Sequence, residues 1–262
     1  MNNWRLIDTN EGTGEYNMEF DLKLLAAAER GEIPPTLRFY RWNPPAVSLG
    51  SGQKPEEETN LDFCRQNRIE VVHRPSGGGA ILHEDEITYS FTSRISDHPA
   101  FKDLMSSYYI LVEGLMEGLK KIGVNAQVRG GKSSGPERYI PCFALSSRHD
   151  LVTNDKKIIG SAQRRKKNAF MQHGSIPISY NPQLIAGVFR NPQDFFDKAT
   201  SISEILGHRP EDAVIKKALV KGMEEVFGVK FQKNMSFPRV PSLSSPCVVN
   251  GDPHFKKFRF PT

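Results

Sequence analysis

Three consecutive glycines, at positions 77–79, are the feature that most constrains the fold of this chain. They separate a β-branched run at residues 69–73 from a short apolar run at residues 80–82, and Arg74 and His83 flank them. Glycine permits positive φ and lets a ligand approach main-chain N–H groups without a Cβ in the way. A flexible hairpin connection is the ordinary interpretation of such a run. The alternative is a backbone shaped around a bound ligand, with Arg74 and His83 supplying charge and hydrogen bonds.

Short stretches of alternating polar and apolar residues surround the glycines and predict strands. The predicted strands are residues 4–7, 36–42, 46–49, 69–73, 80–82, 88–92, 124–128, 149–153, 157–162, 169–178 and 229–231. Residues 80–82 are expected to pair with residues 88–92 as a hairpin. A second hairpin is expected around the turn at residues 154–155. Because the strands occur mostly in hairpins, the sequence predicts an α+β fold, with a largely antiparallel or mixed β-sheet flanked by helices.

The helical period appears in residues 15–30, 60–67, 102–122 and 210–227. With 262 residues and 38% hydrophobic composition, the chain is long enough for one large domain, predicted over residues 1–232. Residues 233–262 form a Pro-rich C-terminal tail that is too short for a core of its own. We expect no separate accessory domain.

Charge, cysteine content and hydropathy restrict the partners and the cellular surroundings that we expect for the chain. A net charge of +5 is modest and does not require a nucleic acid partner. No apolar run approaches the ~18 residues of a membrane span, so no membrane association is expected. Three widely spaced cysteines fit reduced thiols in a cytoplasm. The seven histidines show no metal-ligand spacing, which predicts no metal site.

Three further features follow the glycines along the chain. Cys142 comes after a segment rich in Gly, Ser and Pro, and a buried structural thiol is its ordinary interpretation. Lys157 precedes Gly160-Ser161-Ala162, where it places one cation beside a backbone that a ligand can approach closely; alone it would be an exposed strand lysine. His173-Gly174 falls on the next strand, where a core or edge histidine is the ordinary interpretation.

In combination, these motifs resemble the biotin/lipoate protein ligase superfamily over roughly residues 4–231. The resemblance implies the catalytic-domain fold of that superfamily, which is class II synthetase-like. It also implies chemistry on lipoate, octanoate or biotin, delivered to a lysine of a small carrier domain. The residues implied in substrate binding are Arg74, Ser76, Gly77, Gly78, Gly79, His83, Gly160, Ser161, Ala162, His173 and Gly174.

Within the superfamily, Cys142-Phe143 followed by Lys157 resembles the cysteine-dependent, lipoate-protein-ligase-like octanoyltransferases. That branch implies catalysis by Cys142, which carries the acyl group as a thioester, and by Lys157, which favours the thiolate. The octanoyl group would pass from octanoyl-acyl carrier protein to a lysine of a lipoyl-accepting protein, such as the glycine-cleavage H protein or a lipoyl domain of a 2-oxoacid dehydrogenase. No cofactor is needed, because one thioester is exchanged for another. A monomer is expected.

Two other functions remain open from the sequence. An ATP-dependent lipoate or biotin ligase would use ATP and Mg²⁺ and hold an acyl-adenylate with Arg74, the glycines and Lys157, and Cys142 would then be incidental. A non-catalytic module that binds acyl groups or carrier proteins would keep the fold without the reaction.

Overall fold

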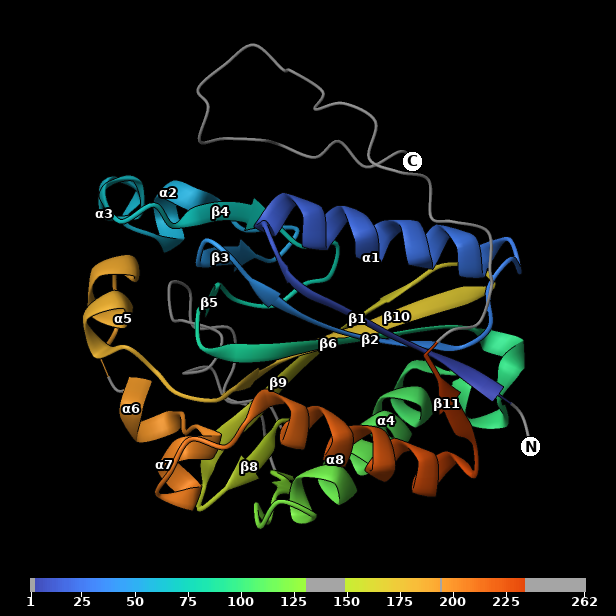
Figure 1. Cartoon of the computed structure of the whole chain (residues 1–262). Helices are drawn as coiled ribbons and strands as arrows, with labels where there is room; N and C mark the ends of the chain where they lie inside the picture. Colours follow the sequence, from blue (N-terminus) through green and yellow to red (C-terminus); the bar gives the residue numbers. More distant parts are fainter. Residues whose placement is uncertain (1–2, 131–148, 194, 234–262) are drawn as a thin grey trace.

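The computed structural model describes residues 3–130, 149–193 and 195–233, and within them two β-sheets lie between layers of helices (Figure 1). The eight-stranded sheet has the order β11-β1-β2-β6-β10-β9-β8-β7, and the three-stranded sheet has the order β4-β3-β5. The strands are β1 (Asn3–Gly12), β2 (Thr36–Trp42), β3 (Ala46–Leu49), β4 (Glu70–His73), β5 (Ile81–His83), β6 (Glu86–Arg94), β7 (Gln127–Val128), β8 (Leu151–Thr153), β9 (Lys156–Arg165), β10 (Ala169–Pro177) and β11 (Lys230–Gln232). The α-helices are α1 (Gly14–Glu29), α2 (Pro55–Glu58), α3 (Leu61–Gln66), α4 (Leu104–Lys120), α5 (Pro182–Val188), α6 (Phe195–Lys198), α7 (Ile202–Leu206) and α8 (Asp212–Phe227).

The large sheet is mixed. β1 pairs in parallel with β2 and β11, whereas β2, β6, β10, β9, β8 and β7 pair antiparallel to one another. The mixed sheet flanked by helices confirms the predicted fold class.

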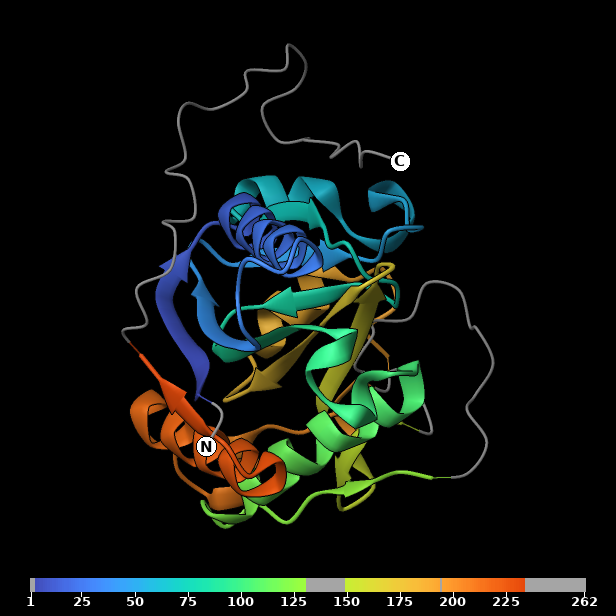
Figure 2. The same ribbon diagram turned by 90° about the vertical axis from the view of Figure 1, so that its right-hand side faces the viewer.

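Helices cover both faces of the large sheet, as Figures 1 and 2 show. Successive side chains of a strand point to opposite faces, so the two faces of β10 serve different layers. Phe170 joins the core cluster under α4 and α8, whereas Met171 packs with α1. Every residue of β10 is buried as a result.

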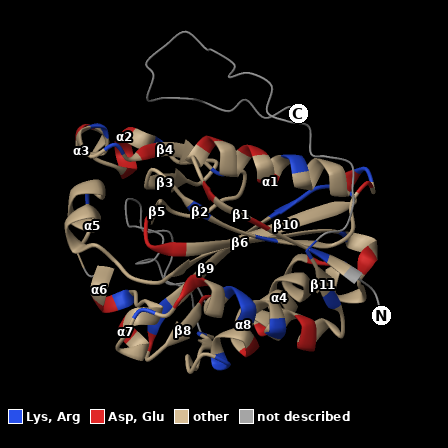
Figure 3. Ribbon diagram, in the orientation of Figure 1, with Lys and Arg blue, Asp and Glu red and all other residues tan. Residues whose placement is uncertain are grey.

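Helices α4 and α8 pack so closely that their backbones are in contact. A Cβ built on Gly222 would lie 2.2 Å from the backbone nitrogen of Gly118, so the contact tolerates no side chain at that position. Charged residues of both signs occur along α8 (Figure 3), and the ammonium of Lys216 lies 2.9 Å from a carboxylate oxygen of Asp8 on β1. The packing therefore fixes α8 beneath the sheet.

One predicted pairing is wrong. Residues 80–82 do not form a hairpin with residues 88–92, because β5 pairs with β3 in the small sheet while β6 pairs with β2 and β10 in the large sheet. Every residue of β6 except Arg94 is buried, and such a central strand has both edges occupied. The chain thus crosses from one sheet to the other between His83 and Glu86.

The remaining elements follow the sequence with two exceptions. The strand predicted at residues 124–128 is only two residues long, and helices α2, α5, α6 and α7 were not predicted. None of the described helices is long and apolar enough to cross a membrane. The Pro-rich tail lies outside the described residues from position 234 onward.

Candidate active site

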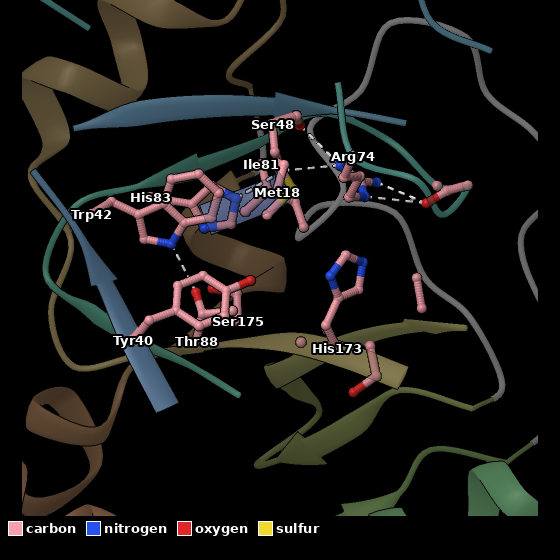
Figure 4. A pocket seen from close by; sticks show the side chains of 16 residues that line it. Met18, Tyr40, Trp42, Ser48, Arg74, Ile81, His83, Thr88, His173 and Ser175 are labelled. Atoms are coloured by element: carbon pink, nitrogen blue, oxygen red, sulfur yellow. Dashed lines mark hydrogen bonds between the residues drawn. The ribbon is translucent and has the colours of Figure 1, made fainter. Parts of the chain in front are cut away.

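A pocket lies between the small sheet and the face of the large sheet that α1 covers (Figure 4). It encloses about 450 Å³ of empty space, part of it open to solvent. Nine residues predicted to bind substrate line it: Arg74, Gly77, Gly78, His83, Gly160, Ser161, Ala162, His173 and Gly174. The fold therefore brings the separate sequence motifs to one place.

The glycine turn is a defined structure held by Arg74. Arg74 is 4% exposed, and its guanidinium donates to the carbonyl oxygens of Ser48, Gly77 and Gly79 at 2.8, 2.9 and 2.7 Å. Gly78 has a φ of 97°, which L side chains rarely adopt. Arg74 thus shapes the pocket wall, and the flexible-hairpin interpretation is wrong.

His83 is fixed between a serine and a buried carboxylate. Its Nδ1 lies 2.9 Å from Glu86 Oε1, and its Nε2 lies 2.7 Å from Ser48 Oγ. The Trp42 indole stacks on the imidazole at a centroid distance of 4.0 Å. Burial alone would raise the pKa of the Glu86 carboxyl, but the charge of His83 and hydrogen bonds from His83, Ser175 and Thr88 bring it below its ordinary value. Glu86 is therefore a carboxylate that accepts hydrogen bonds.

His173 belongs to a second buried network. Its Nε2 lies 2.6 Å from Ser76 Oγ, and its Nδ1 lies 3.5 Å from Asp21 Oδ2. Asp21 also accepts hydrogen bonds from Arg38 at 2.7 Å and from the Tyr40 hydroxyl at 3.0 Å. Burial lowers the pKa of His173, so the imidazole is neutral near pH 7. Ser76 and Gly79, also predicted to bind substrate, do not line the pocket: Ser76 contacts His173, and the Gly79 carbonyl accepts from Arg74.

Lys157 is buried rather than exposed on its strand. Its ammonium lies 3.0 Å from a carboxylate oxygen of Asp150, and both side chains are 4% exposed. Lys157 is three positions before Gly160 on β9, the strand that forms one pocket wall. Cys142, the predicted nucleophile, lies outside the described residues.

Several residues of the site were missed at the sequence level. Of these, Met18, Tyr40, Trp42, Ser48, Ile81, Thr88 and Ser175 line the pocket. Tyr40 and Trp42 share one face of β2, a parity that the alternation of residues 36–42 already contained. Asp150 carried no motif signal. No group of three or more His, Cys, Asp or Glu side chains able to hold a metal occurs in residues 3–130, 149–193 and 195–233.

Solved structures of known proteins share this architecture. The fold matches lipoate-protein ligase A bound with ATP, with a TM-score of 0.78, 23% identity and coverage of 92% of each chain. It also matches a putative lipoate protein ligase of T. acidophilum with bound lipoic acid, with a TM-score of 0.73, 24% identity, and coverage of 92% of this chain and 93% of that one. These likenesses confirm the predicted lipoate ligase catalytic-domain fold.

Relatives found by sequence share a larger fraction of identical residues with this chain than these solved structures do. Octanoyltransferase LipM of Moorella thermoacetica is 35% identical over 240 residues, which cover 87% of this chain and 88% of the relative. The enzyme of the same name from Geobacillus kaustophilus is 35% identical over 85% of each chain. The fold and these relatives define an enzyme of the acyltransferase type. A sequence model of the Lipoyl protein ligase A/B catalytic domain matches residues 13–224, and the chain belongs to that family.

Proposed function

We propose that this chain is an octanoyltransferase of lipoate biosynthesis, which moves an octanoyl group from octanoyl-acyl carrier protein to a lysine of a lipoyl-accepting protein. The observation that carries the proposal is the 35% identity to Octanoyltransferase LipM over 87% of the chain. An archaeal ligase of similar fold is described together with its E2 lipoyl domain, which supports a lipoyl domain as the acceptor.

The pocket suits a medium-length acyl chain. Met18, Trp42 and Ile81 supply apolar wall, and Gly160, Ala162 and Gly174 leave room beside the sheet. Burying the seven carbons beyond the octanoyl carbonyl at about 0.8 kcal/mol each gives a gross contribution of about 5–6 kcal/mol. Such a contribution is large enough to select acyl chains by length.

The reaction proceeds in two transfers through Cys142. The thiolate attacks the thioester of the donor, the carbon–sulfur bond to the carrier breaks, and an octanoyl thioester forms on Cys142. The acceptor lysine amine then attacks that thioester and gives an amide. The Lys157 ammonium favours the thiolate by its charge and protonates the departing carrier thiolate. The resulting Lys157 amine then accepts the proton that the attacking lysine loses, and the bond to Cys142 breaks as its thiolate leaves. No ATP enters, because the donor is already activated.

Intact-protein mass spectrometry tests the proposal. After mixing with octanoyl-acyl carrier protein without ATP, the wild-type chain should gain an octanoyl group that peptide mapping finds on Cys142, and Cys142→Ser should carry no octanoyl thioester. Lys157→Ala should form the adduct much more slowly, by about a hundredfold or more. Product that forms only with ATP, and that Cys142→Ser leaves intact, would establish an ATP-dependent ligase instead. No adduct and no product with or without ATP would indicate a non-catalytic module.

A further inference from the structure

Two Ser–His–carboxylate chains reach the pocket, and they differ in geometry. In the chain of Ser48, His83 and Glu86, the successive distances are 2.7 and 2.9 Å. In the chain through His173, the serine contact is 2.6 Å but the carboxylate contact is 3.5 Å. Hydrogen bonds between nitrogen and oxygen span about 2.7–3.2 Å. Both contacts of the first chain lie within this range, whereas the carboxylate contact of the second is longer.

The tautomer of His83 follows from its partners. When His83 is neutral with its proton on Nδ1, that nitrogen donates to the Glu86 carboxylate and Nε2 accepts the proton of the Ser48 hydroxyl. Stacking on Trp42, with an interplanar angle of 12°, prevents the ring from leaving this orientation. A nucleophile, a base and a group that orients the base are thus in the order that acyl transfer by serine requires.

Ser48 also has an environment that favours its alkoxide. Ser48 and His83 both line the pocket (Figure 4), and Arg74 Nη1 lies 3.2 Å from Ser48 Oγ. A guanidinium at this distance stabilises negative charge on the oxygen. Gly77 and Gly78 line the same pocket, and within the described part of the chain their N–H groups donate no hydrogen bond. Such N–H groups are suited to an oxyanion.

We propose that Ser48, His83 and Glu86 form a second catalytic centre, which hydrolyses medium-chain acyl esters and thioesters without Cys142. Ser48 Oγ attacks the acyl carbon and its proton passes to His83 Nε2. The bond to the leaving oxygen or sulfur breaks, and the leaving group takes that proton. Water then attacks the seryl ester and gives a proton to His83, and the bond to Ser48 breaks as the proton returns to Oγ. The products are the free fatty acid and an alcohol or thiol.

A fluorophosphonate probe tests the nucleophile on the unaltered full-length chain. Peptide mapping should find the probe on Ser48, and prior incubation with octanoate should slow labelling. Absence of label under conditions that modify a known serine hydrolase would refute the proposal, and so would label on Ser76 instead. This test depends neither on a variant that must fold nor on the thioester of Cys142.

Hydrolysis of p-nitrophenyl octanoate by the Cys142→Ala variant tests the activity. Ser48→Ala in that background should lower the rate at least about tenfold, and His83→Gln and Glu86→Gln should also lower it. Ser106→Ala, an exposed hydroxyl at the start of α4, is the matched control and should keep the rate. Equal rates in Ser48→Ala and Ser106→Ala, with both variants folded by circular dichroism, would overturn the proposal.

Discussion

The Arg38–Asp21 pair shows how single residues hold the site in place. Both side chains are fully buried, and Arg38 also donates to Asn17 Oδ1 at 2.7 Å while its guanidinium lies over the Tyr40 ring at 4.0 Å. Burial alone would raise the pKa of Asp21, but Arg38 and His173 lower it below its ordinary value. The carboxylate that faces His173 therefore depends on the guanidinium behind it.

Arg38→Met should destabilise the protein strongly. The substitution leaves the Asp21 carboxylate buried without its cation, which costs about 3–5 kcal/mol. Urea unfolding at pH 7 measures the free energy of unfolding. Arg30→Met, which breaks the exposed pair between Arg30 and Glu32, should leave the unfolding midpoint nearly unchanged because solvent screens that pair. Equal midpoints for the two variants would contradict the role given to Arg38.

At the scale of elements, the hairpin of β9 and β10 forms one wall of the pocket. Ala162 is opposite His173 in this hairpin, and Gly174 is opposite Ser161. A Cβ on Gly174 would lie 2.6 Å from the Gly160 carbonyl oxygen, so the wall is as thin as the backbone allows. Small residues here leave the pocket open beside the strands.

Ala162→Leu should shift the acyl preference toward shorter chains. Leucine adds three carbons to the pocket wall, and each methylene of the substrate that loses its place forfeits about 0.8 kcal/mol, or roughly fourfold in affinity. Competition between hexanoyl and octanoyl donors measures the ratio. Lys166→Leu, at the exposed end of the same hairpin, is the control and should keep the wild-type ratio. An unchanged ratio in Ala162→Leu would exclude Ala162 from chain-length selection.

The sequence predicted where strands and helices occur better than it predicted which strands pair with one another. Residues 36–42 and the hairpin around residues 154–155 are strands as expected, because alternation and the turn are local signals. β5 was assigned to the wrong neighbour, since nothing in residues 80–82 distinguishes an edge of the small sheet from an edge of the large one. Helices α5, α6 and α7 have seven, four and five residues, too few to establish a clear period.

At the scale of the molecule, the site exists only where the two sheets meet. Ser76 and His173 are 97 positions apart in the chain, yet their side chains are in hydrogen-bond contact. The motifs indicated which residues share a pocket, because glycines and a histidine at those spacings resemble a known family. Asp21, Glu86 and Asp150 have no such motif, and only the packed fold shows that they hold His173, His83 and Lys157.

The same buried groups make the whole fold sensitive to acid. Burial lowers the native pKa values of His173 and the less buried His98, so the unfolded chain binds their protons first as the pH falls. The stability of the native state is therefore lost progressively below about pH 6.5, the ordinary value for histidine. The carboxyl pKa values of Asp21 and Glu86 are also lowered in the native state. Their contribution is complete above about pH 4.5 and is lost as the pH falls through the native values.

Urea unfolding from pH 8 to pH 3 should therefore show a first decline below about pH 6.5 and a steeper one below about pH 4.5. His173→Gln should flatten most of the first decline and keep the second, because the amide does not titrate while Asp21 and Glu86 still do. His208→Gln, at an exposed position after α7, is the matched control and should reproduce the wild-type curve. A wild-type free energy of unfolding that stays constant between pH 7 and pH 5 would show that the unfolded chain takes up no more protons there than the native fold, and would contradict a neutral, buried His173.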